Sequence, residues 1–279
     1  MKKDFSSIYR FISFEYFVNI VQTQKLTFVK PELWEDPYEG FVFKALKSKE
    51  GKLQIESIAK SLNPKIQIPI MMINHFSDLF HGQSWSKHEE TDALWRIYSY
   101  NNRAVRIEID NDSISRLENV ICDEVVYKDF SSLKEEIEDL FDDEGKKISF
   151  VKILLRKRKA FEHEGEVRLL TQPNFDFLPD NKTDGQRILM NKALSAARDN
   201  GMITMGMFNT GMKDNNKNTE TPKVIPKVIS IDFSHIKKFI KSVFLHPSSP
   251  EWYVNTVKDY CKKNKVRFIG KSKLYTFEV

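Results

Sequence analysis

The chain has 279 residues, of which 41 % are hydrophobic and 12 % aromatic, enough apolar material for one large domain. Its 44 basic and 39 acidic residues leave a net charge of +5, which permits an anionic partner without requiring one. The two cysteines lie far apart and no Cys/His ligand spacing occurs, which argues against a disulfide framework or a structural zinc site. With no signal peptide and no apolar run of membrane-spanning length, we expect a cytoplasmic protein without membrane contact.

The first third of the chain predicts a strand, a helix and a strand, followed by a loop. An aromatic strand is expected over 7–11, and Ser13 can cap a helix over 14–21. A second strand follows at 26–29. Two prolines and a glycine predict a loop over 30–40, and a helical stretch then runs to Leu62.

The middle of the chain is expected to alternate between strands, a loop and a short helix. The apolar residues 70–76 predict a buried strand, and 82–86 a loop. The following elements are a helix over 91–98, a half-exposed strand over 104–110 and a strand over 123–127.

Charge is arranged in blocks in the second half of the chain. The range 131–159 predicts one long helical region or two helices, acidic in its first half and basic in its second, and Gly165 ends it before a strand that begins near Glu166. The range 171–226 contains four prolines and predicts a flexible, insertion-like segment with a helix over 186–199. Strands over 227–233 and 240–245, a helix over 251–264 and a strand over 267–277 close the chain. Together the elements predict a single α+β domain over 1–279, with a mixed, mostly antiparallel sheet flanked by helices.

The C-terminal part carries more positive charge than the chain as a whole. Between His235 and Lys273, ten basic residues face only Glu251 and Asp259, a local net charge of +8. Clustered positive charge of this kind favours an anionic macromolecule as partner.

The densest group of chemically useful side chains is Glu164, Glu166 and Arg168. Residues two apart in a strand point to the same face, so the three could line one wall together. Neighbouring carboxylates repel each other, which raises the pKa of one of them and suits acid–base chemistry or the stabilisation of positive charge. The alternative is an exposed edge strand with alternating charges.

Arg10, at the end of the first strand, has two interpretations. It could hold a phosphate or a ribose, or it could form a salt bridge to the loop of Asp36 and Glu39. Nearby aromatic residues could stack on a base or on nicotinamide, although aromatic side chains are more often part of the core. They are Trp34, Tyr38, Trp85, Trp95, Tyr98 and Tyr100.

Two other kinds of catalysis can be compared with the sequence, a hydrolase triad and a metal-dependent nuclease. His75 and His163 have no Ser or Cys partner at motif spacing, so a hydrolase triad has almost no support. A magnesium-dependent nuclease stays open, because acidic side chains from several segments could converge. They are Asp36, Glu39, Glu108, Glu164 and Glu166.

These motifs, in this order, resemble an uncharacterised bacterial family, a domain of unknown function found in phage-defence and toxin-like settings. The similarity covers most of the chain and is weaker over 171–226, and the chain departs from the family's pattern at Val167 and His163, beside the glutamates. The matching segments are Tyr9-Arg10-Phe11, Leu26-Thr27-Phe28, Asp36-Pro37-Tyr38-Glu39, His75-Phe76-Ser77, Leu94-Trp95 to Tyr98, Ala104 to Asp110, Glu164-x-Glu166-x-Arg168 and Lys271-Ser272-Lys273-Leu274-Tyr275.

More distantly, the arrangement is similar to the ADP-ribosyltransferases, which implies a split sheet and NAD as the substrate that supplies ADP-ribose. The resemblance implies that Glu166 is the catalytic glutamate and that Glu164 orients or deprotonates the acceptor. It also implies that NAD binds against a set of basic and aromatic residues, namely Arg10, Tyr9, Tyr38, Trp95, Tyr98 and Arg168.

The sequence therefore predicts an NAD-dependent ADP-ribosyltransferase-like toxin or defence effector, without a bound metal. The expected acceptor is a nucleic acid, RNA or DNA, or else a protein, and an antitoxin is a possible partner. Two alternatives remain: a metal-dependent nuclease or phosphodiesterase, and a non-catalytic binding or sensor module of a phage-defence system.

Overall fold

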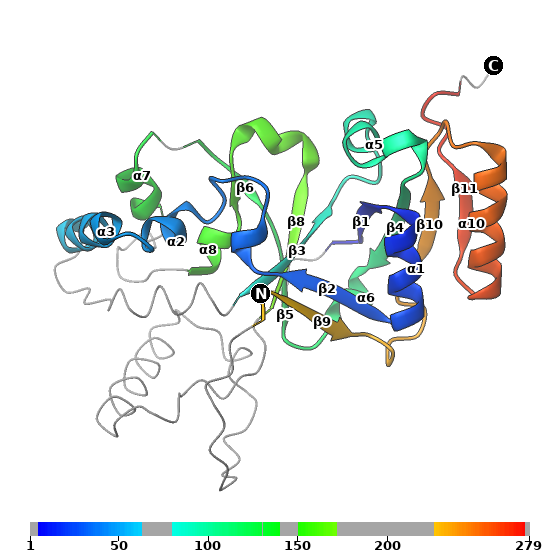
Figure 1. The fold of residues 1–279 in the computed structure, drawn as a ribbon, viewed down its shortest axis with the longest axis horizontal. Helices are drawn as coiled ribbons and strands as arrows, with labels where there is room; N and C mark the ends of the chain where they lie inside the picture. Colours follow the sequence, from blue (N-terminus) through cyan, green and yellow to red (C-terminus); the bar gives the residue numbers. More distant parts are fainter. Residues whose placement is uncertain (1–4, 63–79, 130, 140–149, 172–225, 277–279) are drawn as a thin grey trace, which may run out of the picture.

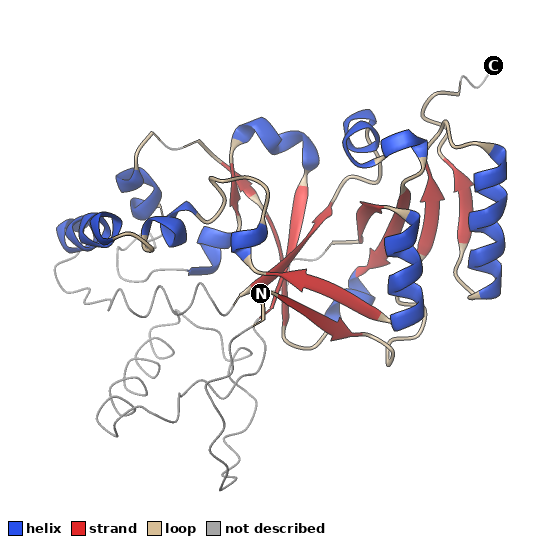
Figure 2. Ribbon diagram, in the orientation of Figure 1, coloured by secondary structure: helices blue, strands red, loops and turns tan. Residues whose placement is uncertain are grey.

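The structure is a computed structural model that describes residues 5–62, 80–129, 131–139, 150–171 and 226–276. Strands cross the middle of the molecule and helices flank them (Figures 1 and 2). The strands are β1 (Ser7–Ile12), β2 (Lys25–Val29), β3 (His81–Ser86), β4 (Val105–Asp110), β5 (Val120–Glu124), β6 (Val126–Tyr127), β7 (Arg156–Lys157), β8 (Glu166–Thr171), β9 (Val228–Asp232), β10 (Ser242–Leu245) and β11 (Phe268–Lys271).

The helices are short, apart from three of ten or more residues. The α-helices are α1 (Phe14–Thr23), α2 (Phe41–Ala45), α3 (Lys49–Leu62), α5 (Asp92–Tyr98), α6 (Asn111–Ser115), α7 (Leu133–Glu138), α8 (Phe150–Leu154) and α10 (Glu251–Lys263), and the 3-10 helices are η1 (Pro31–Leu33), η2 (Tyr100–Asn102) and η3 (Lys159–Glu164). None of the helices within the described ranges is long and apolar enough to cross a lipid bilayer.

The nine-stranded sheet divides at β3. Its order is β11-β10-β4-β1-β3-β2-β9, and β8 pairs with β3 along its whole length and with β5 on its other side. In contrast, β1 pairs with β3 only at Tyr9 opposite Ser86, and β2 only at Val29 opposite Gly82. Because β8 occupies one edge of β3, strands β1 and β2 share the other edge and diverge along it. Apart from β10 with β11, the pairs of this sheet are antiparallel.

The main core lies between the sheet and helices α1 and α10. Ile8 of β1 and Phe17 of α1 are fully buried in it, and the Phe17 ring lies 5.8 Å from Tyr260 of α10. A smaller core packs α5 against the sheet, where Trp95 meets Phe11 edge to face at 4.7 Å. Burying side chains of this size stabilises a fold by roughly 1.5–3 kcal/mol each, so both faces of the β1 region are held firmly.

Much of the predicted architecture is confirmed. The fold is α+β with a mostly antiparallel sheet. Ser13 caps α1 by accepting from the Tyr16 amide, and Thr91 caps α5 by accepting from the Leu94 amide. Gly165 ends η3 with φ of +50°, the left-handed backbone that glycine adopts without strain.

The largest correction concerns 82–86, which is not a loop but β3, the strand at which the sheet divides. Its polar side chains obscured it, yet they are satisfied inside the fold: Gln83 donates to the Thr27 carbonyl and Ser86 to the Glu164 carbonyl. Gly82 is required there, because a Cβ atom would come within 2.6 Å of the Trp34 ring. A strand made mostly of small polar residues shows no alternation of apolar and polar side chains, so its sequence does not indicate a strand.

Other predictions changed in detail. The strand β4 is mostly buried rather than half-exposed, because α5 and the main core cover its two faces. The described part of 131–159 holds two short helices, α7 and α8, in line with the second of the two expectations, but the basic half also forms β7; the last strand spans only Phe268–Lys271. The predicted strand at 70–76 and the segment 171–226 with its helix lie outside the described residues.

Candidate functional site

Strand β8 carries two buried charges that form an ion pair. The Arg168 side chain is 1 % exposed and that of Glu166 is 2 % exposed, and Arg168 Nε lies 2.7 Å from Glu166 Oε1. The other Arg168 nitrogens bond Glu39 Oε2 at 3.0 Å and the Leu154 carbonyl at 2.6 Å, while its guanidinium stacks on Trp34 at 4.1 Å. The exposed edge strand weighed as an alternative is therefore wrong, since β8 lies between β3 and β5 with all six residues buried.

A lysine from β7 joins three carboxylates. Lys157 Nζ lies 2.7 Å from Glu164 Oε2, 3.1 Å from Glu166 Oε2 and 3.4 Å from Glu39 Oε1. The ammonium group takes the central position that a cation would need among these carboxylates. Within the described ranges, no three His, Cys, Asp or Glu residues are placed to hold a metal ion.

The charges of this cluster shift the pKa of its members in opposite directions. Burial alone would raise the pKa of Glu166, but Arg168, Lys157 and the Ser84 hydroxyl outweigh it and lower the pKa to about 2. Burial raises the pKa of Glu39, and the charge of Glu166 adds to the rise. Glu166 is thus ionised at neutral pH, and the raised pKa expected from neighbouring carboxylates belongs to Glu39.

Solvent reaches the cluster at Ser84, in the middle of β3. This residue is exposed although its neighbours Gln83 and Trp85 are buried, and its hydroxyl donates to Glu166 Oε1 at 2.5 Å. The Glu164 side chain is 11 % exposed and uses only Oε2 to bind Lys157. An exposed hydroxyl beside an ionised glutamate, together with the more accessible carboxylate of Glu164, suits the binding of a polar substrate.

Arg10 lies where β1 separates from β3, and part of its charge is unmatched. Its Nη1 atom is buried without a hydrogen-bond partner, and its guanidinium lies over the Tyr16 ring at 5.4 Å. Burial lowers the pKa of Arg10, while Tyr16 and Tyr98 partly offset the shift. The predicted salt bridge to Asp36 and Glu39 does not form, because Arg158 binds Asp36 at 3.0 Å and Arg168 binds Glu39.

Tyr98 connects Arg10 to the glutamates. It ends α5, a helix that contacts both β1 and η3. Desolvation of the phenol, together with the charges of Glu164 and Glu166, raises the pKa of Tyr98 to about 12, and Tyr98 in turn acts on Arg10. Tyr98 therefore lies within electrostatic reach of Arg10 and of both glutamates.

Three predicted NAD-binding aromatic residues lie elsewhere. Trp95 is fully buried in the smaller core and donates to Glu90 Oε2, so its surface is unavailable to a ligand. The Tyr9 ring lies 5.0 Å from the Arg106 guanidinium on the face that packs against α5. Tyr38 stacks on Arg158 at 4.4 Å and lines a hollow of about 290 Å³ next to α7.

The remaining predicted acidic residue, Glu108, does not join the cluster. It accepts hydrogen bonds from Ser7 at 2.8 Å and from Ser242 at 2.5 Å, on the β1–β4–β10 side of the sheet. The convergence of five carboxylates that a magnesium nuclease would use is therefore not seen.

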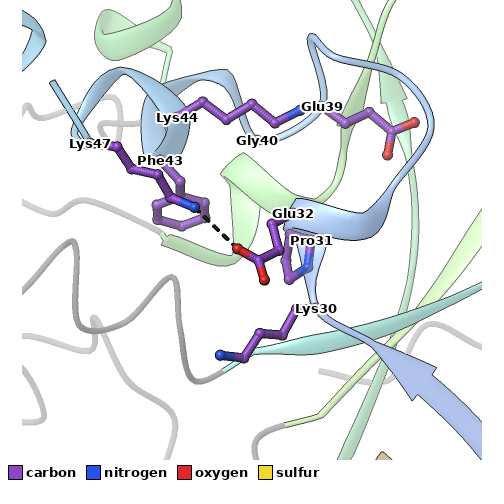
Figure 3. Close-up of a pocket in the computed structure, with 8 residues that line it drawn as sticks. All are labelled: Lys30, Pro31, Glu32, Glu39, Gly40, Phe43, Lys44 and Lys47. Atoms are coloured by element: carbon purple, nitrogen blue, oxygen red, sulfur yellow. Dashed lines mark hydrogen bonds and ion pairs between the residues drawn. The ribbon is translucent and has the colours of Figure 1, made fainter. Parts of the chain in front are cut away.

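A further hollow, lined by Glu39 and other residues of the range 30–47, is too small for a nucleotide. It measures about 20 Å³, room for roughly one water molecule. Figure 3 shows the Glu32–Lys47 ion pair within it and the Glu39 carboxylate pointing away from that pair. The lining residues are Lys30, Pro31, Glu32, Glu39, Gly40, Phe43, Lys44 and Lys47.

Sequence reasoning missed two residues of the cluster, Lys157 and Ser84. Lys157 belongs to the basic half of the range 131–159, which was predicted to be helical. Ser84 belongs to 82–86, which was predicted to be a loop. The sequence offers one weak signal for Lys157, its position nine residues before Glu166. The strand that carries it, β7, has two residues and is too short to show a periodic pattern.

Comparison with known proteins gives no match for this chain: no family model, no curated protein and no solved structure resembles it. The site therefore has to be interpreted from its own geometry.

Proposed function

We propose that this protein transfers ADP-ribose from NAD to a macromolecule, with nucleic acid the favoured acceptor. The observation that carries the proposal is the buried Nη1 of Arg10, for which the described residues supply no acceptor, together with the partly accessible carboxylate of Glu164; Tyr98 lies within electrostatic reach of both. A buried donor without a partner costs free energy unless a ligand satisfies it, and a phosphate or ribose oxygen of NAD would do so.

The two glutamates take different parts in the proposed reaction. Glu166 accepts hydrogen bonds from Arg168, Lys157 and Ser84, so it remains a negative charge beside the exposed Ser84. Its field favours the positive charge that develops on the ribose as the bond to nicotinamide breaks and the bonding electrons leave with nicotinamide. Glu164, more accessible, would accept the proton of the attacking acceptor group as the new bond forms at the ribose carbon.

Metal-dependent nuclease chemistry is less well supported by the same geometry. Lys157 Nζ lies within 3.4 Å of the three clustered carboxylates, so a divalent cation would have to displace it.

The test is transfer from radiolabelled NAD. The full-length protein is incubated with labelled NAD and cell extract or RNA, once in EDTA and once in Mg²⁺, and the products are separated. Glu164→Gln is expected to reduce label transfer by about 10²–10⁴-fold, the usual effect of removing an acid–base group. Glu118→Gln serves as the control, because Glu118 is exposed and lies outside the carboxylate cluster.

Absence of transfer and of NAD turnover by the wild-type protein would remove the proposal. Nucleic-acid cleavage that requires Mg²⁺ would point to the nuclease. A folded protein with neither activity would be a binding or sensor module.

A further inference from the structure

A third hollow lies beside Tyr98; none of the clustered carboxylates lines it, and its lining includes exposed aromatic rings. Its volume is about 450 Å³, between the N-terminal end of α1, the η2 turn and the first turns of α10. Tyr100 is 88 % exposed, Trp252 57 % and Tyr98 44 %. Single exposed aromatic residues are ordinary, but three around one hollow form a surface that water solvates poorly.

The hollow is held in shape by hydrogen bonds between η2 and α10. Tyr253 donates to the Arg103 carbonyl at 2.6 Å, and Ser249 donates to the Asn102 carbonyl at 2.9 Å. Asn101 and Asn102 both have left-handed backbones, with φ of 60° and 58°, which asparagine tolerates better than most residues. The turn therefore presents Tyr100 outward without any need for its ring in packing.

A cation is already stacked at this surface. The Arg103 guanidinium lies 4.9 Å from the Trp252 ring. A planar cation and aromatic rings are the two kinds of group on which unpaired nucleobases stack.

The edge of the sheet next to the hollow is strongly basic. The chain from α10 to β11 forms one edge of the molecule, shown in orange and red in Figure 1. Exposed cations follow α10 to its C-terminal end and beyond, where a phosphate backbone leaving the hollow would meet them. They are Lys258, Lys262, Lys263, Lys265, Arg267, Lys271 and Lys273.

We infer that this aromatic hollow binds single-stranded nucleic acid, with unpaired bases against Tyr100 and Trp252 and the backbone along the basic edge. Single strands fit because their bases are free to stack, whereas a duplex offers only phosphates and groove edges. Tyr98 lines this hollow, and the charge of Glu164 contributes to the raised pKa of its phenol, so the carboxylate lies within electrostatic reach of a strand held here. As a binding site the hollow stands alone, and only its role in presenting the acceptor rests on the proposed transfer reaction.

The test is fluorescence anisotropy with a short labelled oligonucleotide, single-stranded or annealed to its complement, without NAD. Trp252→Ala and Tyr100→Ala are each expected to weaken single-strand binding about tenfold, the usual scale for one stacked base. Leu53→Ala is the matched control: Leu53 is 58 % exposed and lies on α3, at the opposite end of the molecule (Figure 1). Circular dichroism melting confirms that each variant is folded.

A second measurement addresses the basic edge. The double variant Lys262→Gln/Lys263→Gln is expected to bind less tightly and to show a shallower dependence of affinity on salt, since fewer counterions are released. The inference is overturned if the wild-type protein does not bind the single strand, if it binds the duplex equally well, or if both aromatic variants bind like the wild type. Because NAD is absent, these outcomes are independent of whether transfer from NAD occurs.

Discussion

The two arms of the divided sheet bury arginines in opposite ways. On β8, Arg168 uses all its nitrogens, bonding Glu39, Glu166 and a backbone carbonyl. On β1 and β4, Arg10 and Arg106 keep buried nitrogens without hydrogen-bond partners: Nη1 of Arg10, and Nε and Nη2 of Arg106. Among the described residues, only the first type has an acceptor for every nitrogen, whereas Arg106 donates to Glu89 through Nη1 alone.

This contrast separates a structural charge from one available to a ligand. A buried charge whose partners are all present holds neighbouring strands in place, and removing one partner leaves the others uncompensated. A buried donor without a partner contributes nothing to the fold and is satisfied only when something binds. Arg168 therefore belongs to the framework of the site and Arg10 to its binding surface.

The largest effect is expected from Arg168→Met. The change leaves Glu39 and Glu166 buried with Lys157 as their only cation, so the free energy of unfolding should fall by about 3–5 kcal/mol. Urea denaturation followed by circular dichroism measures it. Arg96→Ala, which breaks an exposed pair with Asp92 on α5, should leave the midpoint unchanged, and equal effects of the two variants would contradict the distinction.

Acid should weaken the fold through Glu166. The folded pKa of about 2 lies below the ordinary 4.5, so the stabilisation is complete above pH 4.5 and is lost as the pH falls toward 2. The shift corresponds to about 3 kcal/mol. Glu39, whose pKa is raised by burial, works in the opposite sense, since protonation relieves its cost.

Melting temperatures between pH 2 and pH 7 check this dependence. Glu166→Gln should flatten the acid side of the curve, whereas Glu118→Gln, at an exposed position, should leave it as in the wild type. An acid limb of the same steepness in Glu166→Gln would show that other carboxylates are responsible.

A smaller effect is expected from Ser84→Ala, which removes one of the three donors to Glu166. The hydroxyl is exposed and water can replace it, so the loss should be about 1 kcal/mol in the free energy of unfolding. The same denaturation experiment measures it, with Ser234→Ala on an exposed turn as the control. A loss as large as that of Arg168→Met would mean that Ser84 is part of the framework and not an exposed hydroxyl that water can replace.

The smallest effect on stability is expected from Arg10→Met. Replacing an incompletely paired buried cation by an apolar side chain of similar length is often neutral or stabilising. The melting temperature should therefore be equal to or above that of the wild type. A loss comparable to that of Arg168→Met would place Arg10 in the framework and remove the contrast.

The sequence predicted those elements whose signals are local. Caps at Ser13 and Thr91, the break at Gly165 and the periodic helices α1 and α10 were found because each depends on a few adjacent residues. The strand β3 was missed because its small polar residues are satisfied by distant groups, such as the Thr27 carbonyl. For β8 the sequence left two interpretations open, a shared wall of side chains or an exposed edge strand, because the partner Glu39 lies 129 residues from Arg168.

The candidate site was predictable only in part for the same reason. Glu164, Glu166 and Arg168 were chosen by spacing, but Lys157 and Glu39 meet them only through the fold. Aromatic residues were the least predictable, because Trp95 and Tyr98 lie three apart on one short helix, one fully buried and the other open. The elements that pack against a helix decide which of its side chains are exposed.

The most direct test is a calorimetric titration of NAD into the wild-type protein and into Arg10→Met. We predict that the wild type binds NAD with a dissociation constant between about 1 μM and 1 mM, the usual range for enzyme substrates. Arg10→Met, with an unchanged melting temperature, should bind at least tenfold more weakly. Tyr38→Ala, in the hollow of about 290 Å³ next to α7, should bind like the wild type. No heat of binding in the wild type, or equal affinity in Arg10→Met, would contradict the assignment of Arg10 to a ligand.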